Sequence, residues 1–345
     1  MNQIILDHIS RLELGDCLEH GNMSVLPLFV KEPVGPEYLT LGEALDANLF
    51  LVTEVDESGS VPNLAVFNQS DRPVLILDGE ELKGAKQNRV LNTTVLVAAG
   101  AKIVIPVSCT EQGRWSYNSR GFSDSEVVMH SSGRARKCVD VSTSLAEGHS
   151  FAGDQGAVWE EVDVLSRKTQ SASPTSAMRQ AFEDRQQDLE QYGQAFTLVE
   201  GQAGVLVMID GKVVGFDLLS RPEAYARLHE KLVRSYAMDA LTRTGADAPS
   251  KLSPATDPAE TARTFLDNIQ TCREERFDSV GLGADLRFAG DSVVGSGLLV
   301  DVSVVHTAFF WGYRGGRGLG EGMSRSSARM WSRLLSGDSD EGMDR

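Results

Sequence analysis

The sequence predicts an α+β fold, in which an N-terminal antiparallel sheet, sandwich-like or barrel-like, is followed by β-hairpin and helix units that pack on it. Up to about residue 110, short apolar runs alternate with turn-forming residues, and almost no helical pattern interrupts them. Amphipathic helical patterns and a hairpin turn follow after residue 173. Strands that come before helices along the chain favour the α+β class over parallel βαβ units.

The strands of the N-terminal part are expected to be short. Thr40-x-x-Glu43 is a capping-box pattern and predicts a single short helix from Leu41 to Ala47. Short strands at close spacing, with turn residues between them, are typical of a sandwich or a barrel. The predicted strands are residues 25–30, 50–55, 63–67, 74–77, 90–97 and 101–107.

The later part of the chain predicts three amphipathic helices. The first should begin at Ser173-Pro174, the second after the Ser220-x-x-Glu223 pattern, and the third at Asp257-Pro258. The spacing of their apolar residues predicts one buried face on each helix. These faces consist of Met178, Phe182, Leu189 and Tyr192; of Tyr225, Leu228, Leu232 and Tyr236; and of Ala262, Phe265, Leu266 and Ile269.

A hairpin is predicted where Asp210-Gly211 separates two apolar runs. Residues 210–214 resemble residues 301–305, which lie in a second predicted strand pair at 297–310. Because each pair lies beside an amphipathic helix, a duplicated hairpin–helix unit is one interpretation. The predicted organisation is a β-rich part at 1–118, a polar loop region at 119–174, an α+β part at 175–311 that forms one compact unit with the first, and a flexible tail at 312–345.

Charge and composition exclude several classes of function. The net charge is −16, from 49 acidic and 33 basic residues, which disfavours general nucleic-acid binding and binding to anionic membranes. The first 17 residues have no signal-peptide pattern, and no apolar run approaches the roughly 20 residues of a membrane span. We therefore expect a cytoplasmic protein. Its four scattered cysteines lack zinc-site spacing and are expected to be reduced, and no motif calls for a cofactor or metal.

The polar segment Asp78–Asn92, called the first patch below, is the main candidate for a functional site. It lies between two strongly apolar runs. Side-chain amides both donate and accept hydrogen bonds, so Gln87, Asn88 and Asn92 are candidates for recognising a polar ligand. Arg89 is a candidate for a bidentate bond to a carboxylate or a phosphate.

A second patch, Ser108–Trp115, follows one strand later. Arg114 beside Trp115 combines a charged fork with a flat stacking surface, which suits a nucleotide-like ligand, and Ser108 is a further binding candidate. If consecutive antiparallel strands carry the two patches, these residues lie on one rim. Two structural alternatives remain open: polar residues at strand ends also form solvated turns, and buried Arg–Glu pairs also stabilise sheets.

Three segments carry a resemblance to a known family. They are Tyr38-Leu39-Thr40-Leu41-x-Glu43-Ala44, Leu77-x-Gly79-Glu80-Glu81-Leu82-x-Gly84-Ala85-Lys86-Gln87-Asn88-Arg89, and Pro106-Val107-Ser108-Cys109-x-Glu111-x-Gly113-Arg114-Trp115. They resemble the prokaryotic ARG and rhodanese-phosphatase-associated domain family, over about Leu26 to Phe310. The resemblance implies a link to ADP-ribose or nucleotide-conflict pathways. It implies no catalytic residues.

Three hypotheses follow. The first is a ligand-binding or sensor protein for a nucleotide-derived small molecule, ADP-ribose-like, in a prokaryotic conflict or stress pathway. The second is a hydrolase that uses the carboxylates of Glu80, Glu81 and Glu111 as acid/base groups or as Mg²⁺ ligands, with Glu81 and Glu111 as the catalytic candidates. The third is a scaffold that binds a protein partner or a second copy of the chain. Cys109 is a further nucleophile candidate, although a buried structural thiol is the favoured interpretation.

Overall fold

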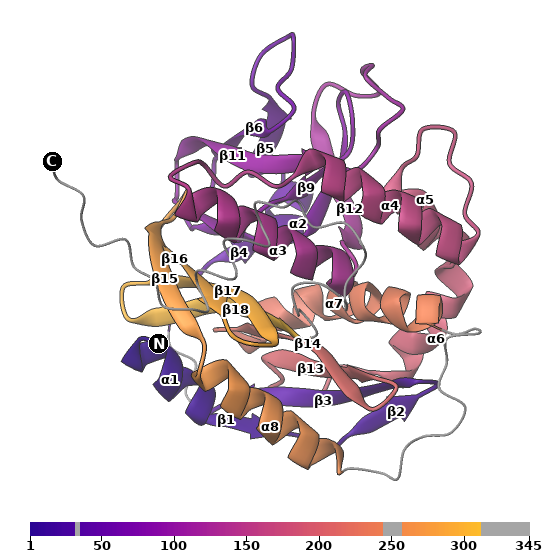
Figure 1. Cartoon of the computed structure of the whole chain (residues 1–345). Helices are drawn as coiled ribbons and strands as arrows, with labels where there is room; N and C mark the ends of the chain where they lie inside the picture. Colours follow the sequence, from indigo (N-terminus) through magenta and orange to yellow (C-terminus); the bar gives the residue numbers. More distant parts are fainter. Residues whose placement is uncertain (32–34, 244–256, 312–345) are drawn as a thin grey trace, which may run out of the picture.

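The largest sheet of the fold has nine antiparallel strands (Figure 1). The computed structural model describes residues 1–31, 35–243 and 257–311, so the predicted tail at 312–345 lies outside the described residues. The strands are β1 (Leu12–Leu14), β2 (Leu18–His20), β3 (Met23–Val30), β13 (Gly204–Ile209), β14 (Lys212–Leu219), β15 (Arg273–Asp278), β16 (Ala284–Ala289), β17 (Val293–Val300) and β18 (Ser303–Trp311). Their order is β1-β3-β13-β14-β18-β17-β16-β15, and β2 pairs with β3.

A second sheet of six antiparallel strands curls into a half-barrel, which confirms the barrel-like form of the predicted N-terminal sheet. Its strands are β5 (Phe50–Glu54), β6 (Asn63–Asn68), β8 (Glu80–Gly84), β9 (Arg89–Leu91), β11 (Lys102–Cys109) and β12 (Phe122–Val128). In the order β12-β8-β9-β11-β6-β5, the two edge strands approach each other. A Cβ atom on Gly121 would lie only 3.2 Å from the carbonyl oxygen of Val52, so the curled sheet leaves little room there.

A small third sheet joins β4 (Leu39–Thr40), β7 (Val74–Ile76) and β10 (Val95–Val97). The β4–β7 pair is parallel and the β7–β10 pair is antiparallel. The predicted strand 90–97 is therefore two strands, because the chain leaves the half-barrel after β9 and enters this sheet at β10. The turn residues Asn92, Thr93 and Thr94 are buried between them.

Helices cover both faces of the nine-stranded sheet (Figure 1). The helices are α1 (Gln3–Ser10), α2 (Leu41–Asp46), α3 (Ser131–Ala146), α4 (Gln155–Thr169), α5 (Met178–Asp184), α6 (Gln186–Ala195), α7 (Pro222–Arg243) and α8 (Pro258–Gln270). α1 and α8 lie on one face, whereas α3 and α7 lie on the other, between this sheet and the half-barrel. The α+β class is confirmed, and the predicted capping box of Thr40 and Glu43 begins α2.

Two expectations about helices are wrong. Residues 119–174 are not mainly loop, because they form β12, α3 and α4. The buried face of α3 contains Arg134 and Lys137, so this helix has no regular apolar spacing in the sequence. The helix expected after Ser173-Pro174 is two helices, α5 and α6, which are separated at Arg185, although its four predicted apolar residues are all buried.

The nine-stranded sheet consists of two units of the same topology. The first is α1-β1-β3-β13-β14 and the second is α8-β15-β16-β17-β18, and they meet where β14 pairs with β18. Both hairpins turn at an aspartate with a φ of 53°, Asp210 and Asp301, and both contain a register shift two residues before the turn. Leu6-Asp7-x-Ile9 in α1 recurs as Leu266-Asp267-x-Ile269 in α8. The described residues 35–203, which form the half-barrel, the three-stranded sheet and α2–α6, are thus an insertion between β3 and β13.

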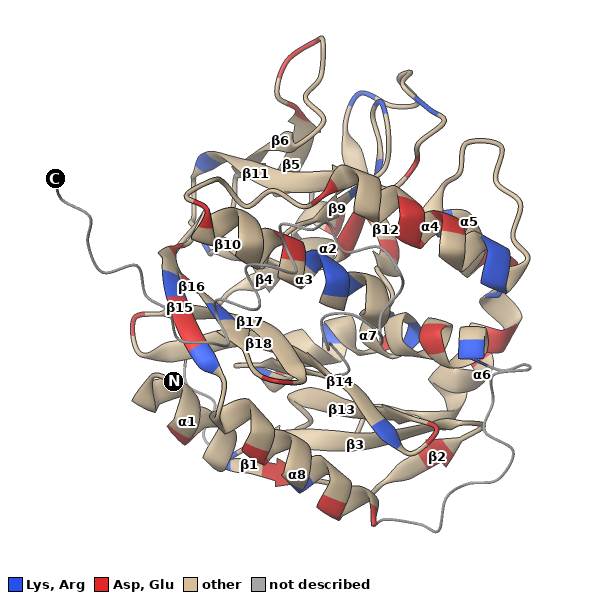
Figure 2. Cartoon of the chain, in the orientation of Figure 1, with Lys and Arg blue, Asp and Glu red and all other residues tan. Residues whose placement is uncertain are grey.

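Acidic side chains are spread over the outer helices rather than gathered on one face (Figure 2). Red residues occur on α4, α6 and α8, which lie far apart in this view. None of the described helices combines the length and hydropathy that a membrane span requires; α7, with 22 residues, carries charges along its whole length.

Candidate functional site

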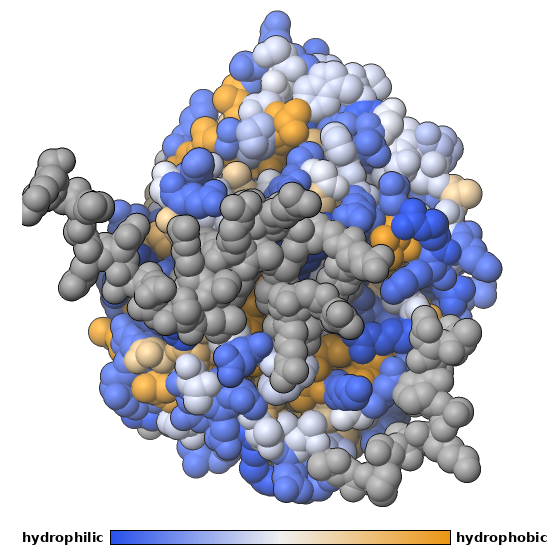
Figure 3. All heavy atoms as spheres, in the orientation of Figure 1, coloured by the Kyte–Doolittle hydropathy of each residue, from blue (hydrophilic) through white to orange (hydrophobic). Residues whose placement is uncertain are grey.

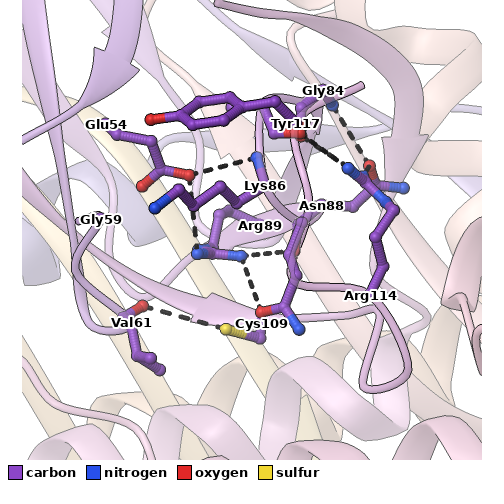
Figure 4. A network of polar contacts seen from close by, with 12 residues as sticks. Glu54, Gly59, Val61, Gly84, Lys86, Asn88, Arg89, Cys109, Arg114 and Tyr117 are labelled. Atoms are coloured by element: carbon purple, nitrogen blue, oxygen red, sulfur yellow. Dashed lines mark hydrogen bonds and ion pairs between the residues drawn. The ribbon is translucent and has the colours of Figure 1, made fainter. Parts of the chain in front are cut away.

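Apolar side chains line the inside of the half-barrel, and three polar side chains, Glu54, Arg89 and Cys109, lie at one end of it. Figure 4 shows these three side chains from close by. Side chains alternate across a strand, so Glu54 faces inward with Phe50 and Val52 of the same strand. By the same alternation, Arg89 shares the inner face of β9 with buried Leu91, and Cys109 shares that of β11 with buried Val107. The interior of the half-barrel is therefore apolar along most of its length and charged at one end.

Arg89 is fully buried but is incompletely paired. Its Nη1 donates a hydrogen bond to Gln87 Oε1 at 3.1 Å, and its Nη2 lies 3.9 Å from Glu54 Oε1. Among the described residues, neither Nε nor Nη2 has a hydrogen-bond acceptor. These two atoms form one side of the guanidinium, called the open edge below, which is suited to two parallel bonds with a carboxylate or a phosphate. Burial lowers the pKa of Arg89 from its ordinary value.

Trp115 packs on Arg89, and Lys86 lies between the rings of Trp115 and Tyr117; Figure 4 shows Lys86 and Tyr117 beside Arg89. The Trp115 ring centroid is 5.5 Å from the Arg89 guanidinium carbon. The Lys86 ammonium is 5.4 Å from the Trp115 ring and 5.0 Å from the Tyr117 ring. Trp115 is 47% exposed and Tyr117 is 54% exposed, whereas Arg89 has no exposed surface. A ligand could thus reach the fully buried open edge only if side chains around Arg89 move. We call Glu54, Lys86, Arg89, Cys109, Trp115 and Tyr117 the barrel mouth.

The structure brings the two sequence patches together through Arg114 and Glu111. Arg114 Nη2 lies 2.6 Å from Glu111 Oε2, and its guanidinium also donates to Asn88 Oδ1 and to the carbonyl oxygens of Gly84 and Ala85. Burial raises the pKa of Glu111, but hydrogen bonds from Arg114 and Thr175 outweigh this and lower it. Gln87 Nε2 donates to the carbonyl oxygen of Glu111 at 2.9 Å. Arg114 is therefore occupied by protein acceptors, unlike Arg89.

Asn92, Ser108 and Glu81 lie on the opposite face of the same strands. Ser108 Oγ donates to Asn92 Oδ1 at 2.8 Å, and Asn92 Nδ2 donates to the carbonyl oxygen of Phe151 at 3.0 Å. Thr110 Oγ1 donates to the fully buried Glu81 at 2.6 Å. Burial raises the pKa of Glu81 to about 7, although the Thr110 and Ser125 hydroxyls lower it.

The carboxylates of the hydrolase hypothesis do not lie on one surface. Glu80 is fully buried and pairs with Lys231, whose ammonium is 3.2 Å away. Glu81 faces away from the barrel mouth, and Glu111 is held by Arg114. In the described ranges, no group of three or more His, Cys, Asp or Glu side chains is arranged to hold a metal ion.

Sequence reasoning did not single out Glu54, Lys86 or Tyr117 as site residues. Glu54 could have been found, because the alternation of Phe50 and Val52 in β5 places it on the inner face. No comparable signal marked Tyr117, which follows the second patch in a loop. Cys109 is a free, buried thiol; burial raises its pKa to about 11, although Arg89 lowers it. It is therefore protonated at neutral pH and is a poor nucleophile.

A second cluster of buried charges joins the insertion to the nine-stranded sheet. Both terminal nitrogens of Arg134 donate to Asp217, at 2.9 and 2.6 Å. Asp217 also accepts a hydrogen bond from Tyr236 at 2.7 Å and lies 3.2 Å from His306. Lys137 pairs with Asp78 nearby. All six side chains are buried, so this cluster connects packed layers and has no exposed surface for a ligand.

Comparison with known proteins places the chain in a family. The family model described as the ARG and Rhodanese-Phosphatase-superfamily-associated Protein domain matches residues 11–310. This span includes both patches, the whole insertion and most of the nine-stranded sheet. No curated protein and no solved structure matches the chain significantly.

Proposed function

The chain belongs to the ARG and Rhodanese-Phosphatase-superfamily-associated Protein domain family, and on that premise we propose that it binds a nucleotide-derived small molecule, ADP-ribose-like, at the barrel mouth. Its role is that of a cytoplasmic sensor in a conflict or stress response, in which ligand binding moves the Trp115 side chain. The observation that carries the proposal is the open edge of Arg89, a buried guanidinium that lacks acceptors for Nε and Nη2 among the described residues.

The chemistry of the barrel mouth supports a ligand that combines an anion with a planar ring. A phosphate oxygen pair can accept two N–H bonds from the open edge, and charge-assisted bonds of this kind are worth about 1.5–3 kcal/mol. Nearly half of the Trp115 surface is exposed, which leaves room for a base to stack on it. Such stacking contributes about 1–3 kcal/mol per base. Mouths of barrels are also frequent ligand sites.

The proposal is tested by calorimetry with ADP-ribose, NAD and a cyclic nucleotide. Adenosine, which has the ring without the anion, and ribose 5-phosphate, which has the anion without the base, separate the two contributions. We expect ADP-ribose to bind more tightly than either fragment. A folded sample that binds none of the phosphate-bearing compounds would contradict the proposal.

Three variants assign the binding to the barrel mouth. Arg89→Met should weaken ADP-ribose binding by roughly 10- to 100-fold, because it removes the charge-assisted pair. Trp115→Ala should weaken binding of ADP-ribose and adenosine but not of ribose 5-phosphate. Arg72→Met, which changes an exposed arginine that pairs only weakly with Asp71 at 3.9 Å, is the matched control and should leave the affinity unchanged.

A further inference from the structure

A cavity of about 650 Å³ lies at the other end of the molecule, between α1, the end of β3 and the start of β18. One face of α1, with Ile4, Asp7 and His8, forms a wall together with Arg11, which follows the helix. The opposite wall includes Val304, and Ser220 lines the cavity between them. Hydrophobic residues reach the surface near α1, at the lower left of Figure 3. We call this cavity the α1 pocket; its volume lies within the range of small-molecule sites.

The second unit of the duplicated sheet provides a comparison for the α1 pocket. Leu219 and Phe310 occupy equivalent positions in β14 and β18, so Trp311 stands in the second unit where Ser220 stands in the first. The Trp311 ring packs on Phe265 of α8, with ring centroids 5.8 Å apart. Phe265 is the counterpart of Ile5 in α1, since the repeated Leu-Asp-x-Ile segments align these positions. The first unit thus has a serine and an isoleucine where the second has two aromatic rings, and the buried Ser220 hydroxyl is hydrogen-bonded to the Tyr38 hydroxyl at 3.1 Å.

The α1 pocket is lined by two cations, Arg11 and Lys31, and by the carboxylate of Asp7, which accepts a hydrogen bond from Gln3 at 2.6 Å. Arg11 is exposed and has no carboxylate partner in the part of the chain that the structure describes. Lys31 also lines the pocket and pairs only with exposed Glu13, at 2.9 Å. His8 Nε2 is buried and has no hydrogen-bond partner among the described residues. Burial lowers the pKa of His8 to about 4, so its ring is neutral at pH 7 and Nε2 can either donate or accept a bond.

We propose that the α1 pocket binds a planar aromatic carboxylate, whose ring takes the place that Trp311 has in the second unit and whose carboxylate faces Arg11. The ring lies between the α1 wall and the apolar side chains of β3 and β18. This site is separate from the barrel mouth, because its lining residues all belong to the repeated units or their immediate ends and not to the half-barrel.

The probes are indole-3-acetate, indole and acetate, added to the full chain and followed by calorimetry and backbone-amide NMR. A ligand of this size should bind with a dissociation constant on the order of 0.1–1 mM. Indole-3-acetate should shift the amide signals of α1 and β18. Arg11→Ala should weaken the binding of indole-3-acetate roughly fivefold and leave the binding of indole unchanged, because only the contact with the carboxylate is lost.

Filling the pocket gives the decisive comparison. Ser220→Trp places an indole where the second unit has one, and Ile4→Trp fills the same space from α1. If one of these variants does not fold, the other still provides the test. Either folded variant should abolish binding, whereas Arg89→Met should retain it. The proposal is overturned if the wild type binds no indole-3-acetate at millimolar concentration, if a filled variant still binds it, or if Arg11→Ala has no effect.

Discussion

Arg89 and Arg134 are both fully buried arginines, yet their surroundings differ in one respect. Arg134 places both terminal nitrogens on the oxygens of Asp217, at 2.9 and 2.6 Å. Arg89 has its nearest carboxylate at 3.9 Å and an open edge. Burial lowers the pKa of both, but Asp217 raises that of Arg134 above its ordinary value, whereas the pKa of Arg89 remains lowered.

The difference separates a structural arginine from a candidate binding arginine. A buried charge costs several kcal/mol of solvation, and good pairing offsets this cost. Arg134 meets that condition within the fold and joins α3 to β14. Arg89 lacks such pairing within the described part of the fold. The solvation cost of its buried charge would be offset better when an external anion occupies the open edge. Burial alone would not have distinguished the two.

The largest expected effect is on stability, and it should differ between a variant that lacks Arg134 and one that lacks Arg89. Arg134→Met leaves Asp217 buried without its main partner and should lower the free energy of unfolding by about 3–5 kcal/mol. Arg89→Met removes a charge that is poorly paired and should change it by less than about 1 kcal/mol. Urea unfolding followed by circular dichroism measures both. Equal losses would mean that Arg89 is a structural residue too.

The comparison extends to a buried acid, Glu81, on the face of the half-barrel strands opposite to Arg89. The pKa of Glu81 rises from 4.5 to about 7 on folding. A raised pKa means that the folded state holds the proton more tightly, so the stability is fully present below pH 4.5 and is lost as the pH rises toward 7. Gln does not titrate. The free energy of unfolding of Glu81→Gln, taken relative to that of the wild type, should therefore rise by on the order of 3 kcal/mol between pH 4.5 and pH 7. A difference that does not change with pH would show that Glu81 ionises normally.

Arg114 provides an intermediate case, because its partners are mostly backbone carbonyls. Arg114→Lys retains the charge beside Glu111, but a lysine cannot reach all of the acceptors at once. The free energy of unfolding should therefore fall by about 1–2 kcal/mol. ADP-ribose affinity should fall by less than it does in Arg89→Met. If calorimetry instead shows the larger loss for Arg114→Lys, the anion binds at Arg114 and the assignment to Arg89 is wrong.

The sequence predicted the elements of the fold better than their long-range pairing. Short apolar runs identified the half-barrel strands, since alternation and turn residues are local signals. Helix α3 was missed because its buried face holds Arg134 and Lys137, whose partners Asp217 and Asp78 are distant in sequence. The duplication was predicted only from the repeated hairpin segment, although the Leu-Asp-x-Ile segments of α1 and α8 also repeat in the sequence. Its remainder depends on strand pairing across the insertion at 35–203, which no local pattern reveals.

The same limit applies to the candidate site. The polar content of the two patches drew attention to Arg89, Arg114 and Trp115, and the fold does bring them close together. Composition could not show which arginine would be occupied by protein acceptors, because that depends on the carbonyl groups of Gly84 and Ala85 in a neighbouring turn. It also could not place Asn92, Ser108 and Glu81 on the opposite face from Arg89.

The smallest expected effect concerns Glu54, the carboxylate nearest to Arg89. Glu54 Oε1 accepts a weak bond from the Lys86 backbone N–H at 3.3 Å, and Oε2 has no hydrogen-bond partner among the described residues. A bound anion would lie close to this carboxylate and be repelled by it. Glu54→Gln removes the repulsion and should tighten ADP-ribose binding roughly three- to fivefold, or about 1 kcal/mol. Adenosine binding should stay the same, and Glu57→Gln, which changes an exposed acid of the adjoining loop, is the matched control. If Glu54→Gln weakens binding, Glu54 positions Arg89 for the ligand, and the two groups form a pair like Arg134 and Asp217 after all.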